Sequence, residues 1–173
     1  MLYQKKNDHL LLIFTRNIGL TDWHNNGSIQ REVSLYNSYL KRGLFKKISF
    51  LTFNPLDIKF LNSEIRNLYF HKDIELISMN KFFSNNFILK SIYFLFCPLI
   101  HYTKCRKVDI VKTNQFDTFF PAFFFKFLLK KKVIYRGGYI HSEFFNHIYY
   151  RIIEKLGFNL FDRIIISSEN LNA

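Results

Sequence analysis

The amino-acid sequence predicts a doubly wound α/β domain, in which helices cover both faces of a mainly parallel sheet. Short apolar runs rich in β-branched residues recur along the chain, and helical patterns of apolar residues separate them. The runs are almost continuously hydrophobic, as strands buried on both faces of a parallel sheet are. The length of 173 residues suits one domain with a core of its own. We therefore expect a single α/β domain over residues 1–173.

Six of these runs are expected to be strands, because each is short and bounded by polar or turn-forming residues. They lie at 10–14, 48–53, 74–78, 109–113, 132–136 and 163–167. No element is assigned to residues 54–73, where the pattern is ambiguous. The alternation of strand and helix over the rest of the chain is typical of a parallel α/β sheet.

Three helices are expected from apolar stripes. Ile29, Val33, Tyr36 and Leu40 have helical spacing and stop at Gly43, a residue suited to a helix C-cap.

A second helix is expected over 119–129, with Asp117 or Thr118 as its N-cap and Pro121 in its first turn. A third stripe runs over 144–156, and we expect Gly157 to close that helix.

The segment TRNIGLTDWHNNGSIQRE, residues 15–32, is much longer than a plain connection between a strand and a helix requires. We expect it to form a floor or wall of a binding site. Its Gly27 either lets a ligand approach the backbone or simply turns the chain into the helix. His24 is a candidate for acid–base chemistry.

Other polar residues follow the fourth and fifth strands, and ligands of open α/β sheets bind at the carboxyl ends of strands. Asn114 and Gln115 suit sugar hydroxyls or polar head groups, or alternatively cap the next helix. Arg136 suits a phosphate or a structural ion pair. The glycine pair ending at Gly138 allows a ligand close to the backbone or serves a turn, and His141 is the second acid–base candidate.

The net charge is +12, and the chain contains 22 Phe and 10 Tyr. A basic surface attracts nucleic acid, anionic lipid or phosphorylated substrates, but AT-rich codons also produce this composition. The aromatic residues follow core periodicity and do not alternate with Lys and Arg, so we expect no nucleic-acid partner.

The two cysteines, Cys97 and Cys105, form neither a zinc pattern nor a disulfide framework, which favours reduced thiols in a cytoplasmic protein. The apolar segment 87–102 is too short for a span and contains Lys90 and Pro98. We expect a buried helix or one lying against a membrane, with peripheral contact to anionic lipid through this helix and 130–132.

The sequence LLLIFTRNIGLTDWHNNGSIQREVSLYNSYLKRG resembles the start of family 4 glycosyltransferases, which have the GT-B fold of two Rossmann-like domains. In those enzymes the first helix begins with G-x-x-x-R-E, which Gly27, Arg31 and Glu32 match. DIVKTNQF, VIYRGGY and DRIIISSENL resemble later strands of the same N-terminal domain in order and spacing. The resemblance covers nearly the whole chain.

This resemblance implies an N-terminal, acceptor-binding domain of a retaining enzyme that moves a sugar from a nucleotide sugar to a saccharide or lipid-linked acceptor. It implies no metal ion and no cofactor. Gly27 would approach the donor, and Asn114, Gln115, Arg136, Gly138 and Tyr139, with His141, would shape the acceptor side. FDTFFPA departs from the glycine and tryptophan that often follow the Thr-Asn-Gln stretch.

The resemblance contains no counterpart of the donor-binding domain, so we expect a truncated or split enzyme that is inactive alone. The alternative is a stand-alone domain that docks a separate donor-binding chain. Neither the sugar nor the acceptor follows from the sequence.

Overall fold

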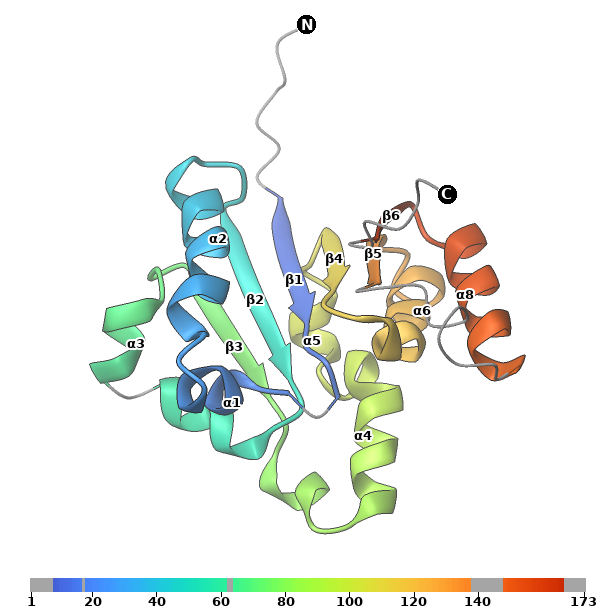
Figure 1. The fold of residues 1–173 in the computed structure, drawn as a ribbon, viewed down its shortest axis with the longest axis horizontal. Helices are drawn as coiled ribbons and strands as arrows, with labels where there is room; N and C mark the ends of the chain where they lie inside the picture. The colour runs from blue at the N-terminus through green and yellow to red at the C-terminus, as the bar shows by residue number, and fades with distance from the viewer. Residues whose placement is uncertain (1–7, 17, 62–63, 138–147, 167–173) are drawn as a thin grey trace, which may run out of the picture.

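The computed structural model describes residues 8–16, 18–61, 64–137 and 148–166 (Figure 1). Its six strands form one parallel sheet in the order β3-β2-β1-β4-β5-β6, which confirms the predicted α/β class. The strands are β1 His9–Ile13, β2 Lys47–Thr52, β3 Ile74–Ser78, β4 Ile110–Thr113, β5 Lys132–Gly137 and β6 Arg163–Ile166. Each strand agrees with an expected run to within one residue at each end.

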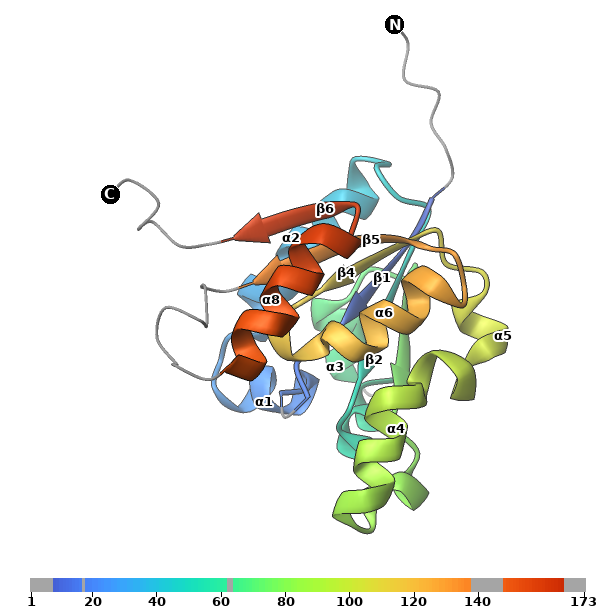
Figure 2. The same cartoon turned by 90° about the vertical axis from the view of Figure 1, so that its right-hand side faces the viewer.

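Helices pack on both faces of the sheet, as predicted (Figures 1 and 2). One face carries α1 Leu20–Asn25, α2 Ile29–Lys41, α3 Glu64–Tyr69 and the 3₁₀ helix η1 Pro55–Leu61. The other carries α4 Phe87–Ile100, α5 Tyr102–Cys105, α6 Phe119–Phe127 and α8 Ile148–Leu160, with the 3₁₀ helices η2 Lys81–Ser84 and η3 Phe116–Thr118. Residues 54–73, to which the sequence pattern gave no element, thus contain η1 and α3.

The first expected stripe is confirmed, because Ile29, Val33, Tyr36 and Leu40 are the buried residues of α2. Gly43 follows the helix with φ of 66°. Its N–H donates to the Leu40 carbonyl at 2.9 Å, and the next N–H reaches back to residue 39 at 2.9 Å. These two bonds form a Schellman motif, which explains why a glycine ends this helix.

Gly157 does not close α8 as expected from the sequence, because the helix continues to Leu160. A Cβ at Gly157 would lie 3.0 Å from the ring of Tyr135, which is fully buried in β5. The glycine therefore allows close packing of a helix on a strand.

Part of the long segment after β1 folds as a short helix, α1, that buries Leu20 and Trp23. The indole of Trp23 lies 4.5 Å from the ring of Phe14, centroid to centroid. The buried carboxylate of Asp57 accepts hydrogen bonds from the Thr21 backbone at 2.9 Å and hydroxyl at 2.8 Å. Packing of α1 thus accounts for much of the length of this connection.

The helix α4 continues through Pro98, which has no N–H to donate to the carbonyl of Phe94. The thiol of Cys97 donates to that carbonyl instead, at 3.6 Å. Cys97 and Cys105 are both fully buried free thiols, and burial raises the pKa of each.

Candidate ligand-binding site at the carboxyl edge of the sheet

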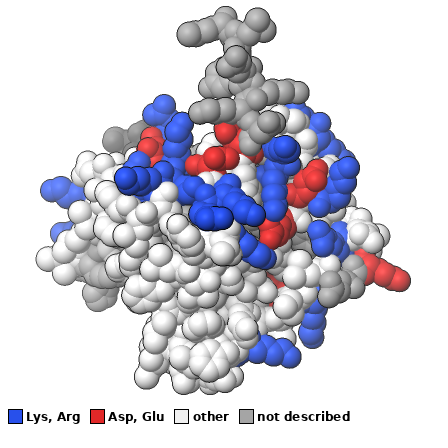
Figure 3. All heavy atoms as spheres, turned by 180° about the vertical axis from the view of Figure 1, so that it is seen from behind, with Lys and Arg blue, Asp and Glu red and all other residues white. Residues whose placement is uncertain are grey.

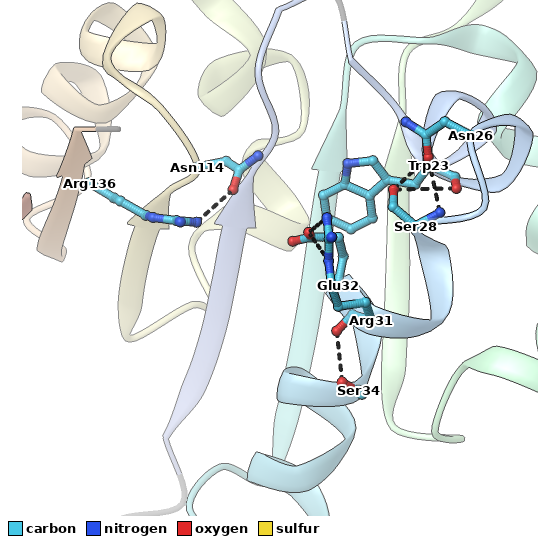
Figure 4. Close-up of polar contacts among 8 residues, drawn as sticks. All are labelled: Trp23, Asn26, Ser28, Arg31, Glu32, Ser34, Asn114 and Arg136. Carbon is cyan, nitrogen blue, oxygen red and sulfur yellow. Dashed lines mark hydrogen bonds and ion pairs between the residues drawn. The ribbon is translucent and has the colours of Figure 1, made fainter. Parts of the chain in front are cut away.

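The strand order places β1 next to β4, and the chain leaves these two strands toward opposite sides of the sheet. Such a switch point opens a crevice at the carboxyl ends of the strands, where α/β proteins bind ligands. Thr15, Asn114 and Arg136 meet here. The Asn114 amide donates to the Thr15 hydroxyl at 3.4 Å. It also accepts from the Arg136 guanidinium at 3.4 Å (Figure 4). Two of the residues selected from the sequence are therefore in contact.

Arg136 is held in place through the backbone of β5. Its N–H donates to the Thr113 hydroxyl at 2.8 Å, and that hydroxyl in turn donates to the Arg136 carbonyl at 3.4 Å. Over the described ranges, no carboxylate lies within ion-pair distance of the guanidinium. A half-buried arginine bound to a neutral amide has donors left for an anionic or hydroxyl-rich ligand.

Lys112, Tyr36 and Glu32 extend this edge toward α2. The Lys112 ammonium donates to the Tyr36 hydroxyl at 3.3 Å and lies 5.2 Å from the centre of its ring. Burial lowers the pKa of Lys112 and the positive charge of Arg136 lowers it further, whereas the Glu32 carboxylate acts in the opposite direction. Two cations on neighbouring strands therefore repel each other, and an anion between them would relieve that repulsion.

The sequence analysis did not select Lys112 or Tyr36. Tyr36 was assigned to the core stripe of α2, where it is indeed buried, and burial raises the pKa of its hydroxyl. The available signal was Lys112 itself, a lysine that directly follows Ile110 and Val111 in a short strand.

Gly27 precedes α2 with φ of 74°, and a Cβ there would meet nothing within 4 Å. The positive φ thus favours glycine at position 27, while the space beside it is open. Arg31 and Glu32 of the G-x-x-x-R-E pattern form an ion pair at 2.8 Å (Figure 4). The Ser28 hydroxyl bonds to the Asn26 side chain at 2.6 Å, which shapes the turn into the helix.

The other selected residues lie apart from this contact or outside the description. His24 is exposed on α1, and its ring faces Phe60 and Tyr69 at 5.7 and 6.4 Å. Gln115 has an exposed side chain, and its carbonyl accepts from the Thr118 hydroxyl at 2.7 Å. Gly138, Tyr139 and His141 lie outside the described residues.

A pocket of about 580 Å³ lies beside the ends of β1, β2 and β3, and sequence reasoning did not find it. We call it the α4 pocket, because α4 forms one wall. Its apolar lining includes Phe53, Leu56, Met79, Phe87 and Phe94, and its cations are Arg16 and Lys90.

A second hollow, of about 650 Å³, lies at the opposite, amino edge of the sheet and is lined in part by Lys47, Lys72 and Glu75. Burial raises the pKa of Glu75, but hydrogen bonds from Lys47 and Lys104 outweigh it and hold the pKa below its usual value. The ammonium groups lie 2.6 and 3.0 Å from its carboxylate. These ion pairs join β2, β3 and α5, so this hollow has a structural explanation.

Comparison with known proteins finds a likeness in fold. The crystal structure of Anabaena Alr3699/HepE in complex with UDP matches with a TM-score of 0.52 at 15% sequence identity. The match covers 91% of this chain and 36% of that one, so this chain spans about a third of the length of HepE. The likeness supports the Rossmann-type α/β fold expected from the sequence.

No protein-family model matches the chain, and no curated protein sequence matches it. Within the described ranges, no helix is both long and apolar enough to span a bilayer. Nor do three or more His, Cys, Asp or Glu side chains in that part of the chain gather as metal ligands.

Proposed function

We propose that this chain forms the acceptor-side, N-terminal domain of a GT-B glycosyltransferase of the family 4 type. The domain holds a saccharide or lipid-linked acceptor while a donor-binding domain, on the same or a separate chain, supplies the nucleotide sugar. The observation that carries the proposal is the contact of Asn114 with Thr15 and Arg136 at the switch point of the sheet. Amide, hydroxyl and guanidinium groups are the donors and acceptors that sugar hydroxyls and phosphates require.

The residues at this edge would bind and orient substrate. Arg136 and Lys112 supply positive charge toward a phosphate or a developing negative charge, and Asn114 fixes the direction of the Arg136 guanidinium. The open space beside Gly27 leaves room for the donor at the start of α2. Retention at the anomeric carbon is part of the proposal, and its support is the sequence resemblance.

Activity would require both domains. We expect the 173-residue chain alone to transfer no sugar, and the chain combined with a donor-binding domain to transfer it. The test follows labelled sugar from a set of nucleotide sugars into saccharide and lipid fractions. Sugar transfer by the purified chain alone would overturn the proposed division of labour.

Variants locate the activity at the proposed edge. Arg136→Gln and Asn114→Ala should each reduce transfer by about tenfold or more, because each removes a charge-assisted or polar contact to substrate. Lys72→Gln is the matched control, since it removes one positive charge at the opposite edge of the sheet. Equal loss in all three variants would exclude a specific role for the carboxyl edge.

The alternative function, a domain that docks a separate donor-binding chain, is favoured by an apolar residue beside the polar edge. Ile165 of β6 pairs with Arg136 in the sheet ladder and is 42% exposed. A second chain would bury it. Co-purification of a donor-binding protein with the wild-type chain, lost in Ile165→Asp, would support this function.

We also propose that the protein works in the cytoplasm at the inner face of a membrane. Large apolar side chains are exposed along α4 and α6, among them Phe87, Ile88, Phe96, Phe123 and Phe127. When the molecule is seen from behind the view of Figure 1, a broad uncharged surface lies below a band of Lys and Arg (Figure 3). Apolar insertion together with basic residues is the combination that binds anionic bilayers.

Liposome sedimentation tests this location. Binding should rise with the anionic lipid content, and Ile88→Asp should weaken it. Leu68→Asp is the matched control, because Leu68 is 76% exposed on α3, on the other side of the sheet, and Ile88 is 68% exposed. Binding that ignores lipid charge, or equal loss in both variants, would contradict the proposal.

A further inference from the structure

The α4 pocket combines apolar walls with positive charge and has no acidic residue in its lining. The walls come from the ends of β1, β2 and β3 and from α4 between Phe87 and Phe94, so the pocket opens at the carboxyl edge of the sheet. A volume of about 580 Å³ is within the range of small-molecule sites. The lining therefore suits a ligand that is apolar along most of its length and negatively charged at one end.

Arg16 is fixed in a defined position at this pocket. Its guanidinium carbon lies 5.2 Å from the ring centre of Phe94 and 5.4 Å from that of Phe87. Nη2 donates to the Ser91 hydroxyl at 2.8 Å. Stacking and this bond orient the planar fork before any ligand arrives, which lowers the entropy cost of binding an anion.

Within the described ranges, no ion pair involves the Arg16 guanidinium. The nearby carboxylate of Asp117 accepts from the Arg16 backbone N–H at 2.9 Å. Lys90, one turn from Phe87 and Phe94 along α4, adds a second cation to the lining. Two cations without a carboxylate in the pocket match the double negative charge of a phosphate monoester.

We propose that the α4 pocket binds the phosphate ester of an apolar alcohol, with the phosphate on Arg16 and Lys90 and the chain along Phe53, Met79 and Phe94. Phe87, which is 74% exposed, lines the pocket and also belongs to the exposed apolar surface of α4. The ligand chain can therefore pass from the pocket onto that surface. Its identification as the lipid end of a glycosyl acceptor rests on the proposed function, whereas its binding does not.

Methionine NMR tests this proposal on the chain itself. The sequence has two methionines, Met1 and Met79, so a ¹³C-methyl signal assigned with Met79→Leu reports on the pocket. Hexyl phosphate, hexanol and inorganic phosphate are titrated separately. Hexyl phosphate should shift the Met79 signal saturably. Its affinity should be at least about tenfold higher than that of hexanol or inorganic phosphate, because each of these two ligands satisfies only one half of the site.

Two variants and one control identify the phosphate contacts. Arg16→Gln and Lys90→Gln should each weaken the binding of hexyl phosphate about tenfold and leave the binding of hexanol unchanged. Lys90 is exposed, so its substitution keeps the test valid if Arg16→Gln fails to fold. Lys72→Gln should bind as the wild type does.

Three other outcomes overturn the binding proposal, each in a distinct way. Inorganic phosphate binding as tightly as hexyl phosphate would indicate a free-anion site, and equal binding of hexanol would indicate an apolar cavity only. An absence of saturable shifts would exclude the site. Sugar transfer that persists in Arg16→Gln, after hexyl phosphate binding is lost, would separate this pocket from the acceptor site without affecting the proposed function.

Discussion

Replacing Gly157 by alanine sets helix propensity against packing. Alanine in a helix interior is more favourable than glycine by about 1 kcal/mol. The new Cβ, however, would lie 3.0 Å from Cε1 and 3.5 Å from Cδ1 of Tyr135. An unstrained carbon contact needs about 3.5–4.0 Å, so the ring or the helix must move by about 0.5 Å.

Tyr135 has little freedom to move. It is fully buried, and its ring stacks on Phe161 at 4.9 Å and meets Phe119 at 6.4 Å. Overpacking of this kind costs about 1–3 kcal/mol, which exceeds the gain in propensity. We expect Gly157→Ala to lower the free energy of unfolding by about 1 kcal/mol and the Tm by about 2–4 °C.

Urea denaturation followed by circular dichroism measures the change, and a double-mutant cycle identifies its cause. In a Tyr135→Leu background the ring is absent, so Gly157→Ala should become stabilising by about 1 kcal/mol, the value for helix propensity alone. An increase in stability when Gly157→Ala is made in the wild-type chain would refute the packing argument.

Three further predictions concern stability. Gly27→Ala should cost about 1–2 kcal/mol and Gly27→Asn clearly less, because φ is positive there while space is open; equal costs in urea denaturation would contradict this. Glu75→Gln should destabilise the protein at pH 7, and the difference in stability from wild type should shrink as the pH falls below about 4. The reason is that the stabilisation from a lowered carboxyl pKa is present above the pKa of the unfolded state and is lost as the carboxylate is protonated. A pH-independent difference in Tm would argue against the ion pairs with Lys47 and Lys104. Asn86→Ala should cost about 1 kcal/mol, because the Asn86 side chain accepts from an N–H of the first turn of α4 at 2.8 Å; thermal unfolding unchanged by the substitution would exclude this cap.

The sheet was predictable because each strand is an apolar run that needs no partner to be recognised. The 54–73 region was not, because η1 and α3 are short. The two buried residues of η1, Asp57 and Phe60, contact other elements, and α3 has no buried residue to give an apolar stripe. Gly157 shows the same limit, since a glycine at the end of an apolar stripe looks like a cap until Tyr135 is placed beside it. A sequence pattern reports local periodicity, whereas this glycine is required by its contact with a residue in another element.

The candidate site was predictable in part for a related reason. The rule that ligands bind at strand ends selected Asn114 and Arg136, which are in contact. It also selected His24, whose ring faces other aromatic residues on α1's own side of the sheet. The α4 pocket was missed because its cations, Arg16 and Lys90, are far apart in sequence and only the packing of α4 unites them.

The buried thiols of Cys97 and Cys105 are two internal probes of local unfolding. Both lie in the layer that α4 and α5 form on the sheet, and both are fully shielded from solvent. An alkylating reagent reaches them only when that layer opens, so the rate of modification measures how often it does. Phe94 lines the α4 pocket and lies one turn before Cys97 on the same helix. A ligand seated in the pocket would hold the helix down and slow the labelling of a cysteine that it never touches.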